Sequence, residues 1–334
     1  RWAGDIVVRR DSLVGFGYYE EFVAELEQQE EIAGATPILR TFGLLGPNND
    51  GVQIIGMRLG EFCEVTGFGQ TLHDNSDKKP VFEVKKDSPI AKWLTREQRK
   101  RGFITGVLLL AQHYTGSFSK SKLKSLGIEP GGGINWSLTV FGLTRRGTLA
   151  GSGVGDQQRF WYVNQSDSGL VDVDMYSVYV DFDVLQKLCS MDGMDDGLKR
   201  TNEIRIRLQK GATLETSRQM VTTLWERFVR AKKGELGADL LKDVKIETWK
   251  EYRRNQIAPA EREKTLMIVV FSMIGVVALF IIFALFYMVV TEKIKDLGIL
   301  KSVGGSSWGL GQIFLGYGAL VGLIGAIVGS ILGC

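Results

Sequence analysis

The chain has 334 residues, of which 24% are charged, and its formal net charge is +3. So small a net charge, without a long basic run, argues against nucleic acid as a partner. The mean hydropathy is near zero only because a polar front region, ending at about Lys264, and an apolar tail offset each other. At ~150 residues per domain, the front region has room for two soluble lobes.

The first predicted elements form a small α+β lobe. Residues 18–32 place Phe22 and Leu26 on one side and acidic residues on the other, which predicts an amphipathic helix. Apolar runs bounded by turn residues predict strands at residues 5–8, 38–45 and 52–57. Strands mixed with a helix in this way are typical of an α+β domain.

The middle of the front region is predicted to be rich in strands. Ser88-Pro89 is a suitable start for a helix that runs to about Arg101. Residues 102–113 are apolar but too short to cross a membrane, so we expect a buried helix or strand there. A β-rich lobe is predicted at about residues 102–200, with alternating strands near 171–175 and 178–182 and a short helix at 183–189.

The end of the front region repeats the strand and helix pattern of its beginning. Residues 202–208 alternate between apolar residues and arginines, which predicts a half-buried strand. A helix at 214–232 and a strand at 244–248 follow. Because similar units lie at both ends, we expect one lobe built from both ends of the region. The β-rich lobe would then be inserted into it.

Two long uncharged stretches follow, and both are predicted to be transmembrane helices. They cover residues 265–290 and 313–334, and a helix of roughly 20 apolar residues spans a bilayer. Trp249 and Tyr252, with basic residues up to Lys264, suit a membrane interface before the first of them. Glycines spaced four apart in the second stretch allow close helix packing, namely Gly318, Gly322, Gly325 and Gly329.

The link between these stretches, residues 291–312, is charged and contains one more predicted helix. Apolar residues close to helical spacing predict a short amphipathic helix from Glu292 to Val303, which Gly304-Gly305 would end. On its pattern alone this helix could be a solvated connector or a contact surface for another protein.

Signals for catalysis or metal binding are weak. The chain lacks a GxxxxGK[ST] motif, and Asp192, Asp195 and Asp196 do not follow the calcium-loop pattern. Two distant histidines, His73 and His113, suggest no catalytic group. Cys63 and Cys189 could pair if the region is extracytoplasmic, or stay free. We therefore expect no catalytic residue, metal or cofactor bound by this chain.

The sequence EKIKDLGILKSVGGS, followed by a Gly-rich apolar stretch, resembles the cytoplasmic segment of FtsX-like ABC permeases. That group holds the Lol-type lipoprotein-releasing and MacB-type efflux permeases. The resemblance is strong from Thr248 onward and loose before it. It implies that the segment is the coupling helix that contacts the ATPase. The implied coupling residues are Glu292, Lys293, Asp296, Leu297, Gly298, Leu300, Lys301 and Gly304.

The resemblance also implies a topology and a set of partners. Residues 1–264 would be an extracytoplasmic (periplasmic) domain, a porter-like lobe with an inserted β-rich lobe, on a protein of the inner (cytoplasmic) membrane. The family would place one more transmembrane helix before Arg1 and one after Cys334. ATP and Mg would bind an ABC ATPase partner. Other implied partners are a second permease copy or paralogue, membrane lipid, and a lipoprotein or periplasmic carrier.

The function implied is ATP-driven release or export of a lipoprotein or amphiphile by mechanotransmission from the coupling helix to the extracytoplasmic lobes. Two alternatives stay open at this point. One is an FtsX-like regulator of a cell-wall hydrolase. The other is a membrane-anchored sensor or structural module that works without an ATPase.

Overall fold

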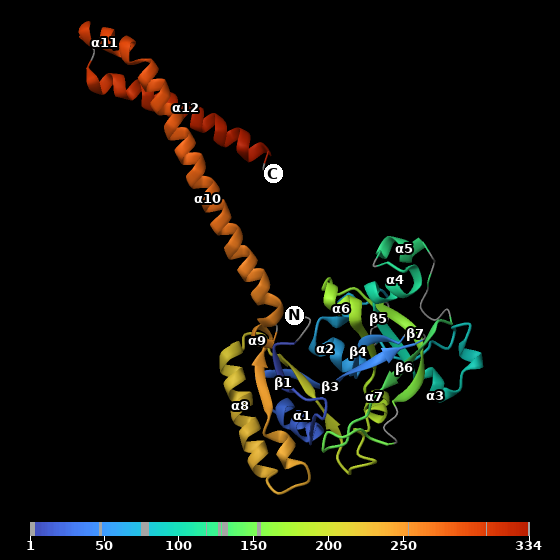
Figure 1. The fold of residues 1–334 in the computed structure, drawn as a ribbon. Helices are drawn as coiled ribbons and strands as arrows, with labels where there is room; N and C mark the ends of the chain where they lie inside the picture. The colour runs from blue at the N-terminus through green and yellow to red at the C-terminus, as the bar shows by residue number, and fades with distance from the viewer. Residues whose placement is uncertain are drawn as a thin grey trace. The chain divides into compact units, whose positions relative to one another are not determined.

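The computed structural model describes residues 4–46, 49–74, 80–117, 119–125, 128, 133–151, 155–252, 254–304 and 306–332. The chain divides into two compact units, residues 1–254 and 255–334 (Figure 1). Each unit is described by itself below. The first combines helices with a mixed sheet, which confirms the predicted α+β class, and apolar helices follow it.

The first unit is built on a nine-stranded sheet with the strand order β11-β1-β10-β3-β4-β8-β5-β7-β6. Most neighbours are antiparallel, but the β4–β8 and β5–β7 pairs are parallel. The strands are β1 (Ile6–Arg10), β3 (Ile32–Leu45), β4 (Asp50–Met57), β5 (Gly102–Gly106), β6 (Asn135–Val140), β7 (Asp156–Ser166), β8 (Ser177–Asp181), β10 (Glu203–Leu208) and β11 (Val244–Thr248). A separate small pair joins β2 (Phe16–Gly17) to β9 (Arg200–Thr201).

Strand β3 links two parts of this sheet. Its first half pairs with β10, whereas its end pairs with β6 at residues 43–45, so the strands from β3 to β6 close into a ring. Between these pairings, the Asn202 side chain hydrogen-bonds to the β3 backbone as a neighbouring strand would. Its amide donates to the Arg40 carbonyl (2.5 Å), and its oxygen accepts from the Arg40 N–H (2.8 Å). The predicted β-rich region thus shares one sheet with its flanks, and a separate lobe at 102–200 stays a prediction.

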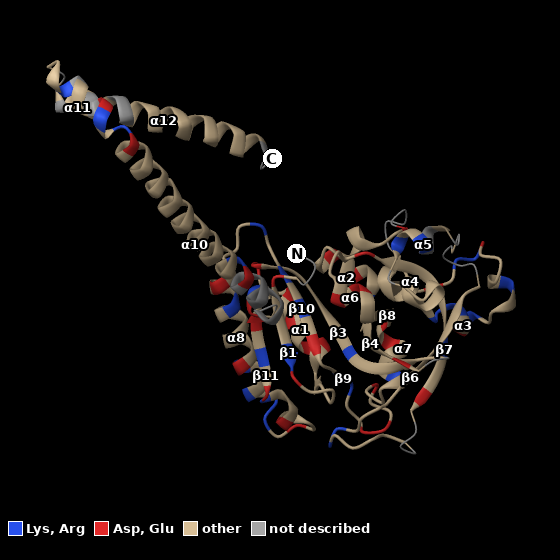
Figure 2. Cartoon of the chain, turned by 45° about the horizontal axis from the view of Figure 1, so that its top comes forward, with Lys and Arg blue, Asp and Glu red and all other residues tan. Residues whose placement is uncertain are grey.

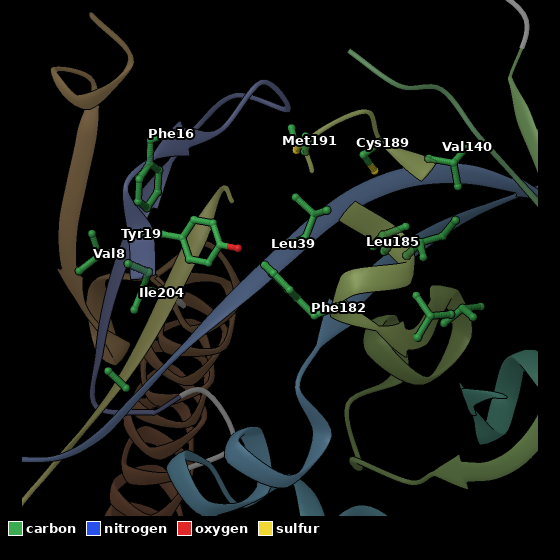
Figure 3. Close-up of a cluster of buried hydrophobic side chains, with 14 of the residues drawn as sticks. Val8, Phe16, Tyr19, Leu39, Val140, Phe182, Leu185, Cys189, Met191 and Ile204 are labelled. Carbon is green, nitrogen blue, oxygen red and sulfur yellow. The ribbon is translucent and has the colours of Figure 1, made fainter. Parts of the chain in front are cut away.

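Helices cover the sheet and enclose the main core. They are α1 (Tyr19–Glu27), α2 (Leu59–Val65), α3 (Arg96–Arg99), α4 (Val107–Thr115), α5 (Lys120–Ser125), α6 (Val171–Tyr176), α7 (Phe182–Leu188), α8 (Leu214–Ala231) and α9 (Trp249–Tyr252). Three 3₁₀ turns complete them, η1 (Phe68–Thr71), η2 (Ala91–Trp93) and η3 (Ala238–Leu241). Figure 3 shows Tyr19 of α1 and Phe182 of α7 beside Leu39 of β3, and the two rings meet edge to face with centroids 5.7 Å apart.

Two sequence predictions in this unit are wrong. The helix expected from Ser88 to Arg101 is broken into η2 and α3, because Thr95 and Gln98 form a capping box that starts a new helix. The strand expected near 171–175 is the helix α6. There the buried Asp174 carboxylate accepts hydrogen bonds from the Ser168 and Gly169 N–H groups, which folds the chain back before it can extend.

The second unit contains three helices, α10 (Arg254–Glu292), α11 (Ile294–Ser302) and α12 (Ser307–Leu332). Residues 263–292 of α10 are long and apolar enough to cross a membrane. In the described part of α12 the apolar stretch, 315–331, is shorter. Apolar side chains along both helices are exposed, so in water neither would be stable without lipid or a partner to cover it.

Candidate functional site

The candidate site is α11, the short helix between the two apolar helices. Lys293 separates it from α10, and Gly304 follows its end with a φ of +94°. Glycine adopts that left-handed conformation without the strain that a side chain would add. The Gly304 N–H donates to the Lys301 carbonyl (3.2 Å), which closes the last turn. The predicted end of the helix is therefore confirmed.

The structure places most of the predicted coupling residues on α11 but not all of them. Glu292 is the last residue of α10, and Lys293 lies between the helices, so both precede the helix to which they were assigned. Asp296, Gly298 and Lys301 lie within α11. Leu297 and Leu300 also lie in α11, but their side chains are outside the described residues.

The described side chains of α11 combine charge with exposed apolar groups. Figure 2 shows charged residues on α11 between helices that carry few. The Lys293 ammonium and the Asp296 carboxylate form an exposed ion pair at 3.2 Å. Ile294 and Ile299 are 57% and 64% exposed. Exposed isoleucines beside mixed charges are suited to a protein contact, in which the apolar groups are buried and the charges remain at the rim.

The glycines of α12 differ in their surroundings. A Cβ at Gly318 would lie 3.1 Å from Cζ of Phe286 in α10, so this glycine allows close contact between the two helices. At Gly322, Gly325 and Gly329 a Cβ would meet nothing within 4 Å. Gly318 therefore packs within the unit, whereas the other three leave a strip of α12 open.

A cluster of buried charged residues in the first unit, beside Tyr252, was not predicted from the sequence. Glu203 and Arg205 of β10 are only 3% and 2% exposed and form an ion pair, and Arg40 of β3 approaches Glu203 at 3.5 Å. Burial would raise the pKa of Glu203, but the charges of Arg205 and Arg40 outweigh it and lower that pKa. The ring of Tyr252 lies over the Arg205 guanidinium, 4.3 Å from centroid to Cζ.

Sequence reasoning missed this cluster because it assigned Arg205 to an exposed face of the strand. The available signal was that Glu203 and Arg205 lie two apart in a strand and therefore share a face, where opposite charges can pair. Nothing in the sequence indicated that this face is covered.

The remaining candidates have structural roles or none that the structure supports. Asp196 pairs with the buried Arg200 (3.0 Å), and the Asp192 carboxylate accepts from the Met194 N–H. Among the described residues no group of three His, Cys, Asp or Glu side chains could hold a metal ion. Cys63 and Cys189 are both free. Burial raises the pKa of Cys63 to about 11 and that of Cys189 to about 12, so neither is a reactive thiolate at neutral pH.

Comparison with known proteins bears on the last fifth of the chain most directly. Residues 268–334 match the family described as FtsX-like permease C-terminal. A Lipoprotein-releasing system transmembrane protein LolC from Neisseria meningitidis is 33% identical over 90 residues, which are 27% of this chain and 22% of that protein. A LolC from Xylella fastidiosa is 24% identical over 206 residues, 62% of this chain and 43% of that protein. The chain thus spans less than half the length of these relatives.

Two solved structures are similar to the chain at low identity. The periplasmic region of MacB from Actinobacillus actinomycetemcomitans aligns with a TM-score of 0.39 and 10% identity, covering 76% of this chain and 92% of that one. The extracellular domain of the transporter YknZ from Gram-positive bacteria aligns with a TM-score of 0.35 and 12% identity, covering 73% and 98%. Scores this low carry no further conclusion.

The family match falls on α10, α11 and α12, which are the same elements that form the candidate site. The longer LolC alignment covers 62% of the chain and so reaches well beyond those helices. Residues 268–334 thus match the C-terminal part of FtsX-like permeases, and the similarity of the chain to LolC proteins extends beyond that part.

Proposed function

We propose that this permease couples ATP hydrolysis on a partner ATPase to the extracytoplasmic release or export of a lipoprotein or another amphiphile. The observation that carries the proposal is the placement of α11, a short charged helix with exposed isoleucines between two apolar helices. If α10 and α12 cross the bilayer, α11 lies at one membrane surface, where a soluble ATPase can reach it. The names of the LolC relatives support a lipoprotein as cargo.

The proposed mechanism is mechanotransmission. The ATPase closes on ATP and pushes on α11, α10 and α12 tilt, and the movement reaches the first unit along the chain. No cargo has to pass between the helices. In this scheme the first unit is extracytoplasmic, the working unit holds two permease copies or paralogues, and this chain itself performs no catalysis.

The first test is co-purification of the permease from native membranes in mild detergent with ATP, followed by mass spectrometry. We expect an ABC ATPase in stoichiometric amount, together with a lipoprotein if that is the cargo. If no ATPase is recovered, the transporter proposal is wrong and a membrane-anchored sensor becomes the better explanation.

A second test addresses α11 directly. Ile299→Asp would place an unpaired carboxylate in the contact, which costs at least about 1.4 kcal/mol and so weakens ATPase binding at least about tenfold. Ile299→Leu is the matched control, because it keeps an apolar side chain of the same size. Stimulation of the ATPase is the measurement, with membrane content of the permease measured in parallel. Equal ATPase stimulation by both variants would show that Ile299 of α11 does not take part in the contact with the ATPase.

A further inference from the structure

The chain leaves the sheet of the first unit through α9, a single helical turn that is held at its start. The Trp249 N–H donates to the Asp5 carbonyl (3.0 Å). The Glu251 carboxylate accepts from the Thr248 N–H (2.8 Å) and from the Thr248 hydroxyl (2.9 Å), whose oxygen accepts in turn from the Glu251 N–H (3.3 Å). This capping box fixes the turn to the end of β11.

The end of α9 is held by its last side chain, Tyr252. The ring centroid of Tyr252 lies 4.3 Å from Cζ of Arg205 and 5.2 Å from Cζ of Arg9. Its hydroxyl donates to the Glu203 carboxylate at 3.4 Å. A guanidinium over an aromatic face is attracted more strongly when it is desolvated, and Arg205 is nearly completely buried.

The partners of Tyr252 connect it to four adjacent strands. Arg9 belongs to β1 and forms an ion pair with Glu247 of β11 at 2.7 Å. Arg205 belongs to β10, and Glu203 joins it to Arg40 of β3. These strands are neighbours in the order β11-β1-β10-β3, so a displacement of Tyr252 acts on the whole of that part of the sheet.

Stability alone does not explain this cluster. Burying charged groups costs desolvation free energy, and apolar side chains of similar volume often stabilise a protein as well or better. A buried ion pair with a stacked ring does fix geometry, because the planar guanidinium makes directional contacts. The cluster is therefore better suited to holding α9 in one position than to stabilising the fold.

Position along the chain gives the cluster its role. The first unit ends at Arg254, where α10 begins, so a movement of α10 that is carried along the chain reaches α9 before it reaches the sheet. We propose that Tyr252, held by its contacts with Arg9 and Arg205 (the clamp), is the positioning residue that transmits movement of the membrane helices to the sheet. This inference rests on the proposed mechanotransmission and names the contact through which it acts.

The experiment uses the permease in lipid nanodiscs with the ATPase that co-purifies with it. Hydrogen exchange of β1 and β10 is compared with and without MgATP and vanadate, which trap the closed ATPase. We expect a nucleotide-dependent change in the wild type and its loss in Tyr252→Leu, while ATPase stimulation and exchange without nucleotide stay unchanged. A merely structural role would instead raise exchange without nucleotide.

Two further variants sharpen the result. Tyr252→Phe keeps the ring and should keep the nucleotide-dependent change, and Tyr176→Leu, an exposed tyrosine of α6, is the matched control. If Tyr252→Leu does not fold, Arg9→Met removes one guanidinium and should weaken the change. A full response in Tyr252→Leu, or in Arg9→Met where that variant replaces it, would overturn the clamp. So would a loss in Tyr252→Phe. A wild type that neither stimulates the ATPase nor responds to nucleotide would instead overturn the proposed function.

Discussion

The two units of the chain differ in where their apolar side chains lie. In the first unit large apolar residues such as Phe22 and Phe182 are completely buried, whereas in the second Phe271 and Phe280 are each 70% exposed. The first unit therefore excludes water from its own core. The second presents its apolar residues outward, as a lipid-facing surface does. Among the described side chains, those of the first unit show the packing that the hydrophobic effect in water favours, and those of the second unit do not.

The units also differ in how they place charge. The first buries charges in pairs, such as Glu203 with Arg205, while the second keeps its described charges on exposed positions, such as the Lys293–Asp296 pair. A buried pair resists displacement because separating it leaves an unpaired charge. An exposed pair contributes little and leaves its partners free to bind another protein. This contrast fits the proposed mechanism, in which the first unit is moved as a rigid body and the second unit contacts the ATPase.

The largest effect on the free energy of unfolding is expected when a phenylalanine is truncated to alanine in the first unit rather than in the second. Phe22→Ala should lower the free energy of unfolding by about 4 kcal/mol, because it leaves a cavity beside Trp225 and Phe228. Phe280→Ala, its matched control in α10, should change it by less than about 0.5 kcal/mol. Urea unfolding of the chain in detergent, followed by tryptophan fluorescence, measures both. Equal effects would mean that Phe280 is packed as closely as Phe22.

The buried charge cluster gives the next effect. Glu203→Gln should cost about 3 kcal/mol at pH 7, because it leaves Arg205 and Arg40 without their carboxylate. The pKa of Glu203 is lowered from 4.5, so its contribution is complete above about pH 4.5 and is lost as the pH falls through the lowered value.

The stability difference between wild type and Glu203→Gln should therefore shrink below pH 4.5. Unfolding experiments across that range test it. Glu235→Gln, at an exposed ion pair with Lys232, is the control and should have little effect at any pH. A difference that stays constant with pH would show that folding does not lower the pKa of Glu203.

The strongest periodic patterns were sufficient to predict several elements. Strand β11 has the predicted bounds, and α8 differs from its prediction by one residue, because local periodicity alone marks these segments. The dual pairing of β3 could not be predicted in this way. Its partners β10 and β6 come from distant parts of the sequence, and Asn202 replaces a strand only after they are in place.

The candidate site was predictable in part for a similar reason. The length of α11 and its end at Gly304 depend on local residues, and both followed from the sequence apart from the first two positions. Tyr252 was assigned to a membrane interface because Trp and Tyr are common there. Its guanidinium partners lie in β1 and β10, and no local pattern connects residues so far apart.

A charge in the middle of α10 tests the lipid-facing character of the second unit. Val277→Arg should make insertion less favourable by about 2.5 kcal/mol, since a guanidinium at the centre of a membrane helix is poorly solvated. Ile294→Arg, just past the apolar stretch, is the control and should have little effect. A translocon insertion assay measures both, and unchanged insertion of Val277→Arg would argue that α10 does not span the bilayer.

The smallest expected effect separates the glycines of α12. Gly318→Leu would press a side chain into Phe286 of α10, where even a Cβ would lie only 3.1 Å away, and overpacking of this kind costs about 1 kcal/mol or more. At Gly322 the same change meets open space, so Gly322→Leu should leave the contact between α10 and α12 intact. A cysteine cross-linking yield between the two helices measures that contact in membranes. If Gly322→Leu alone impaired permease assembly while Gly318→Leu did not, the open strip would serve packing against another helix, and the contact at Phe286 would be dispensable.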